Sequence, residues 1–122
     1  MRFIGTSFGS QKLSQKARII FGDASAGNAA IVAPHIVLAE LFWVFQKLGH
    51  AQAFPGAVAR MQSSPAFRLQ PATVDDLIQL GSFLEIPEMH DRLIAIQASR
   101  LGAPVITRDA SIRASPRVQC VW

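Results

Sequence analysis

Short apolar segments that alternate with longer helical segments are the feature that most constrains how this chain folds. The predicted strands are residues 29–33, 67–70, 104–107 and 117–122. They are β-branched and apolar, without the clean alternation of a half-exposed strand, and helical segments separate them. This pattern is typical of a parallel sheet that helices cover on both faces. The sequence therefore predicts an α/β fold with a short parallel central sheet.

Five helices are predicted from apolar periodicity and from residues that commonly begin or end a helix. They span residues 13–21, 36–48, 54–63, 73 or 75 to about 84, and 88–101, with a short helical turn at 110–114. The residues expected at their ends are Ser10 or Ser14, Gly49, Thr73 or Asp75, Pro87 and Gly102. No linker or internal repeat interrupts the pattern, so residues 1–122 are predicted to form a single domain.

The composition is that of a compact globular protein. Half of the 122 residues are apolar and 16% are charged, which excludes a disordered chain. No apolar run reaches the ~20 residues that span a bilayer, and the N-terminus lacks the pattern of a signal peptide. The single cysteine, Cys120, excludes an internal disulfide and is expected to be a buried, inert thiol. These features favour a cytoplasmic protein that does not contact a membrane.

Charge is sparse, so the positions of the acids are informative. Twelve Lys and Arg residues face eight acids, a net charge of +4 that is compatible with nucleic-acid binding. The basic residues are dispersed along the chain and form no polybasic arm. Five of the eight acids are interpreted as loop or surface residues: Asp23, Asp75, Asp76, Glu85 and Glu88.

The other three acids each interrupt an apolar element. Glu40 lies in a long apolar helix, where a buried carboxylate is costly unless a cation or a donor meets it. Asp91 lies in the first turn of a helix, and Asp109 follows a strand, where parallel α/β sheets gather their ligands. Ordinary roles remain open: an ion pair for Glu40, a favourable helix dipole for Asp91 and an N-cap for Asp109. His90 could orient a carboxylate, although packing is the favoured role.

Three such acids together suggest one anionic pocket that holds a hard divalent cation. Mg²⁺ and Mn²⁺ choose oxygen ligands, and Mg²⁺ keeps several waters, so two to four side chains suffice. His35 and His50 have no zinc-like spacing to each other or to a cysteine. A bound metal would generate hydroxide and stabilise the charge of a phosphodiester under attack, which suits a basic protein.

Four segments together resemble the PIN domain, and more narrowly the VapC-type toxins of bacterial toxin–antitoxin pairs. They are residues 31–40, 86–96, 102–109 and 118–122. The resemblance implies a three-layer α/β/α sandwich and a Mg²⁺-dependent endoribonuclease, with Mn²⁺ as an alternative metal. It also implies an RNA substrate, a cognate VapB-type antitoxin and a homodimer. Glu40, Asp91 and Asp109 match the family's second, third and fourth acidic positions, so they are the expected catalytic and metal-binding residues.

The chain departs from the family at its first strand, which usually ends in Asp-Thr and supplies the first metal ligand. No acid precedes Asp23 here. Either Gly5-Thr6 is a degenerate copy of that strand, or the strand and its Asp are absent, and the short spacing to the next helix favours absence. Weak or no nuclease activity is therefore expected. The alternatives are a non-catalytic PIN domain that docks an antitoxin or dimerises, and an α/β fold that binds an unrelated small ligand.

Overall fold

A computed structural model describes residues 1–5 and 14–122 of the chain. Five strands form one sheet in the order β3-β2-β1-β4-β5, and every neighbouring pair is parallel. The strands are β1 (Arg2–Gly5), β2 (Ala30–Pro34), β3 (Phe67–Gln70), β4 (Val105–Ile106) and β5 (Cys120–Val121). These pairings confirm the predicted parallel sheet. At least one helix returns the chain between consecutive strands, as parallel pairing requires.

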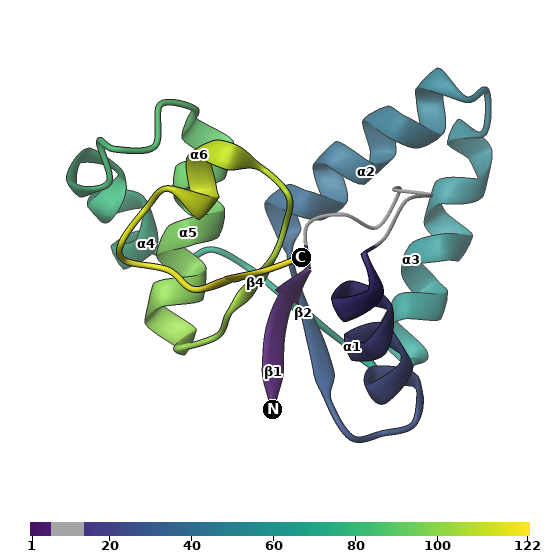
Figure 1. Ribbon diagram of the computed structural model, residues 1–122. Coiled ribbons are helices and arrows are strands. Elements are labelled where there is room, and N and C mark those ends of the chain that lie inside the picture. Colours follow the sequence, from purple (N-terminus) through teal and green to yellow (C-terminus); the bar gives the residue numbers. More distant parts are fainter. Residues whose placement is uncertain (6–13) are drawn as a thin grey trace.

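Helices lie on both faces of this sheet, as Figure 1 shows for α1 and α5. The helices are α1 (Gln15–Ser25), α2 (His35–Lys47), α3 (Phe54–Ser63), α4 (Val74–Ile78), α5 (Met89–Leu101) and α6 (Ala110–Arg113), with 3₁₀ turns η1 (Ala51–Ala53) and η2 (Gln79–Ser82). Because helices cover both faces of the sheet, the observed architecture is the α/β/α sandwich.

Within the described residues, no helix combines the length and the apolar character that crossing a bilayer requires.

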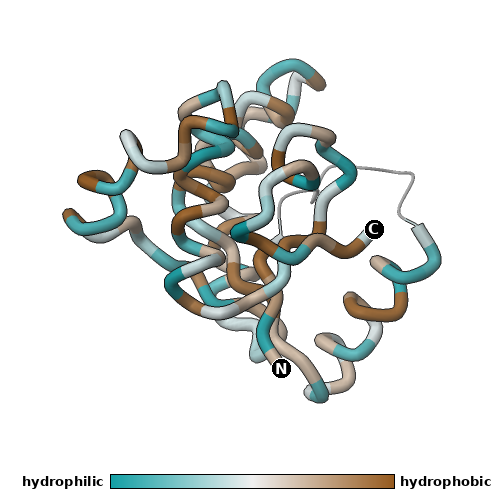
Figure 2. Tube along the Cα trace, turned by 60° about the vertical axis from the view of Figure 1, so that its left-hand side comes forward, coloured by the Kyte–Doolittle hydropathy of each residue, from teal (hydrophilic) through white to brown (hydrophobic). Residues whose placement is uncertain are grey.

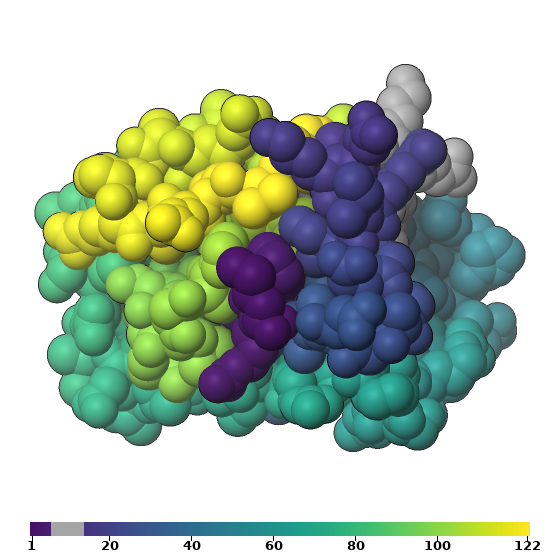
Figure 3. All heavy atoms as spheres, turned by 60° about the horizontal axis from the view of Figure 1, so that its bottom comes forward, coloured from purple at the N-terminus to yellow at the C-terminus, as the bar shows by residue number. Residues whose placement is uncertain are grey.

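The first strand is present, so the favoured expectation that it is absent was wrong. Residues Arg2–Gly5 form β1 at the centre of the sheet, where it pairs with both β2 and β4. Four residues suffice because Phe3 and Ile4 are buried on opposite faces, with 8% and 0% of their surface exposed. Figure 3 shows the start of this strand at the surface, between the atoms of α1 and those of the C-terminal third of the chain. Gly5 ends β1, which fits the interpretation as a degenerate copy, and Thr6 lies outside the described residues.

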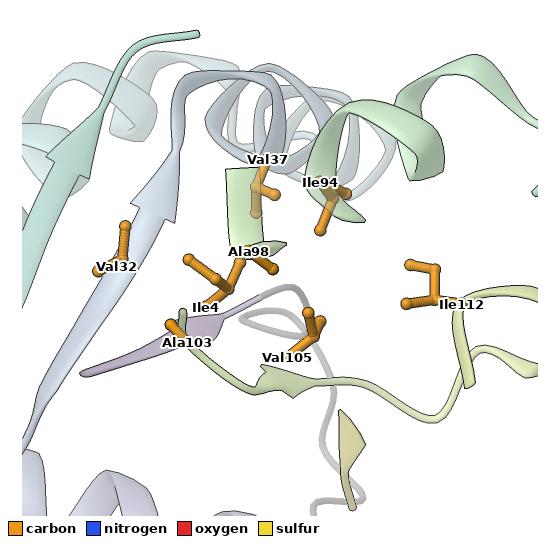
Figure 4. Packing of buried hydrophobic residues seen from close by; sticks show 8 residues of the cluster. All are labelled: Ile4, Val32, Val37, Ile94, Ala98, Ala103, Val105 and Ile112. Atoms are coloured by element: carbon orange, nitrogen blue, oxygen red, sulfur yellow. The ribbon is translucent and has the colours of Figure 1, made fainter. Parts of the chain in front are cut away.

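Two apolar clusters, one on each face, explain why the strands are apolar without alternation. Alternate residues of one strand serve opposite clusters: Ile4 packs with Val32 on one face, and Phe3 packs with Ile31 on the other. Figure 4 shows the first cluster, whose side chains converge from the sheet, from α2 and from α5. Along the chain, Figure 2 shows many apolar residues in the central elements, whereas the outer turns mix hydrophilic and apolar residues.

Local signals place most helix ends. Ser14 caps α1 by accepting a hydrogen bond from the backbone N–H of Ala17 at 3.1 Å, whereas Ser10 and Leu13 lie outside the described residues. Gly102 ends α5 in the left-handed conformation, with φ of 61°. The helix expected to reach about residue 84 is broken instead, because α4 ends at Ile78 and a 3₁₀ turn follows.

Asp76 was expected at the surface, and this interpretation was wrong. Its side chain is buried, with 0% of the residue exposed, and it receives hydrogen bonds from Arg100 Nε at 2.7 Å and Nη2 at 3.0 Å. It also closes a reciprocal capping box with Thr73 at the start of α4. Burial raises the pKa of Asp76, but the bonds and charge of Arg100 and the bonds of Thr73 outweigh it and hold this pKa below its usual value. The pair fastens α4 to α5.

Replacing Asp76 with Asn should lower the free energy of unfolding by about 2 kcal/mol, because it removes the charge of a buried carboxylate that accepts two hydrogen bonds from Arg100. Urea denaturation followed by circular dichroism measures this loss. Asp75→Asn is the matched control, since Asp75 is an exposed neighbour on the same short helix, and its loss should be about 0.5 kcal/mol or less.

The pH dependence gives the same test a second readout. The lowered pKa of Asp76 means that its contribution is present above the ordinary value of 3.8 and is lost as the pH falls through the folded-state pKa. The stability difference between the wild type and Asp76→Asn should therefore shrink in acid. A difference that stays constant below pH 3.8 would contradict the assignment.

Candidate functional site

The three acids singled out in the sequence line one pocket of ≈ 430 Å³. Glu40 comes from α2, Asp91 from the first turn of α5, and Asp109 from the loop between β4 and α6. The remaining lining residues are Ile94, Thr107, Arg108 and Ile112. Two apolar side chains thus form part of a wall on which three carboxylates are presented.

The fold brings these acids together through the sheet order. Strand β2 runs directly into α2, and the chain after β4 leads within three residues to Asp109. Val37 of α2 and Ile94 of α5 share the buried cluster on this face of the sheet, which holds the two helices against each other (Figure 4). The pocket therefore lies at the carboxyl ends of the strands, where parallel sheets place their ligands.

Asp109 is held rigidly by the turn it caps. Its Oδ1 accepts hydrogen bonds from Ser111 N at 2.9 Å, Ser111 Oγ at 2.7 Å and Ile112 N at 3.1 Å, and its own N–H donates to Thr107 Oγ1 at 3.0 Å. The bond from the Ser111 side chain lowers the pKa of Asp109, burial raises it, and the backbone N–H groups of Ile112 and Ser111 leave the net pKa below its ordinary value. Asp109 is thus an ionised N-cap, and among the described bonds its Oδ2 is unused.

The pKa of Asp91 is shifted in the opposite direction from that of Asp109. Burial raises the pKa of Asp91, and the negative charges of Asp109, Glu88 and Glu40 raise it further, to about 6, although His90 lowers it. Burial also raises the pKa of Glu40, with His90 lowering it and Glu88 raising it. The pocket therefore stores electrostatic repulsion that a bound cation would relieve.

His90 and Glu88 add a second layer to the site. His90 Nδ1 lies 3.7 Å from Glu40 Oε1 and 3.3 Å from Glu88 Oε1, so the imidazole faces two carboxylates. Glu88 also caps α5, because its Oε2 accepts the N–H of Asp91 at 2.9 Å. Sequence reasoning placed Glu88 at the surface and missed this role. The signal was present, since an acid three residues before Asp91 can accept its N–H.

The donors suit a hard cation, but they are not drawn together around one point. Carboxylate oxygens are the ligands that Mg²⁺ and Mn²⁺ prefer. Among the described residues, however, no group of three or more His, Cys, Asp or Glu side chains stands ready to hold a metal ion. Mutual repulsion keeps unscreened carboxylates apart, and Mg²⁺ retains waters that bridge to its ligands. The chemistry of the donor set therefore fits, but the side chains would have to approach one another to hold the ion.

Replacing Asp109 with Asn should bring the pKa of Asp91 down from about 6, because Asp109 is the strongest of the charges that raise it. Asn retains a side-chain oxygen for the N-cap, so the turn should survive. Carbon-detected NMR titration of the Asp91 carboxyl measures the change. Asp23→Asn is the control for one lost negative charge, because Asp23 does not line the pocket. An Asp91 pKa that is equal in both variants would contradict the electrostatic coupling.

Comparisons with known proteins agree with this architecture. The PIN domain family model matches residues 5–117, while no curated protein matches the chain. A chain in the crystal structure of VapBC2 from Rickettsia felis, bound to a DNA fragment from their promoter, superimposes with a TM-score of 0.74 at 17% identity. That match covers 99% of this chain and 98% of the other, and at such identity it shows a shared fold. Because the family model spans nearly the whole sequence, the chain belongs to the PIN domain family.

Proposed function

We propose that this PIN domain is a VapC-type, Mg²⁺-dependent endoribonuclease that hydrolyses RNA phosphodiesters in the cytoplasm. The observation that carries the proposal is the pocket in which Glu40, Asp91 and Asp109 meet from three separate elements. The raised pKa of Asp91 supports it, because mutually repelling carboxylates in a cleft are typical of sites that a cation completes. Family membership supports the class of chemistry.

In this proposal Glu40, Asp91 and Asp109 hold the metal, with Mn²⁺ as an alternative to Mg²⁺. When bound, such an ion lowers the pKa of a coordinated water and offsets charge on the phosphate under attack. The chain contributes positioning: Ser111 and Thr107 fix the Asp109 turn, and Glu88 fixes the N-terminus of the helix that carries Asp91. A pre-oriented acid loses less entropy on binding than a mobile one.

We expect a low rate of RNA cleavage, because this chain has Gly5 where the family pattern has its first acid. Gly5 precedes Thr6, as Asp precedes Thr in the family, and it ends β1 beside Ile106 of β4. The chain after Ile106 continues through Thr107 to Asp109, so a carboxylate at position 5 would join the same end of the sheet. With Gly there, three carboxylates remain to hold the metal and activate water.

The test is metal-dependent cleavage of a labelled single-stranded RNA by purified protein. Asp91→Asn should lower the Mg²⁺-dependent rate by at least about 100-fold, since it removes a proposed ligand. Gly5→Asp should raise the rate above that of the wild type. Gly5→Asn is its matched control, because it adds a side chain of nearly the same size without the charge, and it should not accelerate cleavage.

Two outcomes would contradict the proposal. A rate that does not respond to EDTA or to Asp91→Asn would exclude the metal pocket as the source of cleavage. Equal rates for the wild type and Gly5→Asp would show that the missing first acid does not limit the enzyme.

A second candidate function is docking of a partner chain, and one observation favours it. A groove of ≈ 630 Å³ runs along α2 and α3, and Trp43 at its edge is 62% exposed. Its lining is largely apolar: Leu38, Ala39, Phe42, Trp43, Phe54, Val58 and Leu69, with His35 and Gln62. Apolar side chains that line an exposed groove between two helices are available to contact a partner chain. We therefore propose that the groove takes an apolar segment of a cognate VapB-type antitoxin, and that the chain also forms a homodimer.

Trp43→Glu should weaken co-purification with the co-expressed cognate antitoxin by roughly tenfold or more, because it places a charge on an apolar contact. Val74→Glu is the control: Val74 is 72% exposed but lies on α4, away from the groove. A variant with Glu40, Asp91 and Asp109 all changed to amides should still bind. Equal antitoxin binding by Trp43→Glu and Val74→Glu would exclude the groove as the docking site. Sedimentation of the chain alone would measure whether it forms the homodimer.

A further inference from the structure

Among the described residues that line the acidic pocket, Arg108 is the one with a positive charge, and the proposed metal chemistry does not use it. Arg108 lines the pocket with the three carboxylates, yet its side chain is exposed and forms none of the ion pairs found among residues 1–5 and 14–122. The remaining segment, residues 6–13, contains no acid. Two other arginines behave differently, since Arg100 pairs with Asp76 and Arg117 with Glu85. An arginine beside three acids that pairs with none of them is free for a ligand.

Hydrogen bonds hold the residues on both sides of Arg108, although Arg108 itself is exposed. Thr107 on one side is buried, and its Oγ1 accepts the N–H of Asp109. Asp109 on the other side is tied to the first turn of α6 by three hydrogen bonds. These hydrogen bonds hold the backbone on both sides of Arg108, next to the pocket that this residue lines.

Charge balance indicates what Arg108 would bind. Three carboxylates repel a phosphodiester, and a single divalent cation would leave one negative charge uncompensated. The guanidinium of Arg108 would offset that charge among the lining residues, which would weaken the repulsion of an approaching RNA strand. Its planar fork also matches two oxygens of one phosphate, which a lysine cannot do.

We propose that Arg108 binds a backbone phosphate of the RNA that enters the acidic pocket and so positions the strand for cleavage. This inference rests on the proposed function, because it takes RNA as the ligand of the pocket. It assigns Arg108 to substrate binding, distinct from the carboxylates that hold the metal. Loss of this contact should raise KM and weaken RNA binding, and it should leave the affinity for the metal unchanged.

The test is the salt dependence of RNA binding, followed by fluorescence anisotropy of a labelled single-stranded RNA in Ca²⁺, with a gel to show that the RNA stays intact. Each phosphate contact adds about 0.7 to the slope of log affinity against log salt for a single strand. Arg108→Gln should lower that slope by about 0.7 and weaken binding roughly tenfold. Arg108→Lys should keep the slope and bind with intermediate affinity.

Arg113→Gln is the matched control, because it removes the same charge from an exposed arginine five residues away that does not line the pocket. Equal slopes and affinities for Arg108→Gln and Arg113→Gln would overturn the assignment. If Asp91→Asn still abolishes Mg²⁺-dependent cleavage in that case, the nuclease proposal stands and only the role of Arg108 fails. Wild-type protein that binds no RNA overturns both. RNA binding that depends on Arg108 without any cleavage overturns the nuclease proposal and leaves only the phosphate contact of Arg108.

Discussion

The pairing of β1 with both β2 and β4 is the constraint on which the described structure depends. In the sheet order, β1 is the strand that joins the pair β3-β2 to the pair β4-β5. Its four residues hold the two halves in register, with Ile4 opposite both Val32 and Val105. The acidic pocket inherits this arrangement, because Glu40 follows β2 and Asp109 follows β4. A chain without β1 would leave two unpaired edges and would separate those acids.

The pocket balances two opposing demands. Burial raises the pKa of Asp91 and of Glu40, and the charges of Asp109, Glu88 and Glu40 raise that of Asp91 further, so this group of negative charges is unfavourable without a counter-charge. Hydrogen bonds from Ser111 and Ile112 keep Asp109 ionised despite its burial. Asp109 thus has a lowered pKa, whereas Glu40 and Asp91 have raised pKa values that a nearby positive charge would lower. This division suits the proposed cation site, because metal binding would be coupled to the relief of repulsion.

The sequence predicted most of the fold because its signals are local. The boundaries of α3 and β3 were predicted residue for residue, since proline, glycine and serine punctuate that region. The three pocket acids were identified because each interrupts an apolar element. The first strand was missed because its stability comes from partners that are distant in sequence, which a spacing argument cannot see.

The burial of Asp76 escaped sequence reasoning for a similar reason. Its partner Arg100 is 24 residues away on another helix, and nothing within α4 distinguishes Asp76 from its exposed neighbour Asp75. The capping box with Thr73 was readable as a local pattern, but a cap alone does not predict burial. Tertiary ion pairs of this kind become visible only once the helices are packed.

The proposed function requires Glu40, Asp91 and Asp109 to bind one divalent cation at the carboxyl end of the sheet. A crystal structure of the protein grown with Mn²⁺ tests it most directly, since Mn²⁺ gives an anomalous signal and prefers the same oxygen ligands as Mg²⁺. We expect an anomalous peak in the pocket, in contact with oxygens of these three side chains or with waters bound to them. An empty pocket at saturating Mn²⁺, or a peak elsewhere on the protein, would contradict it.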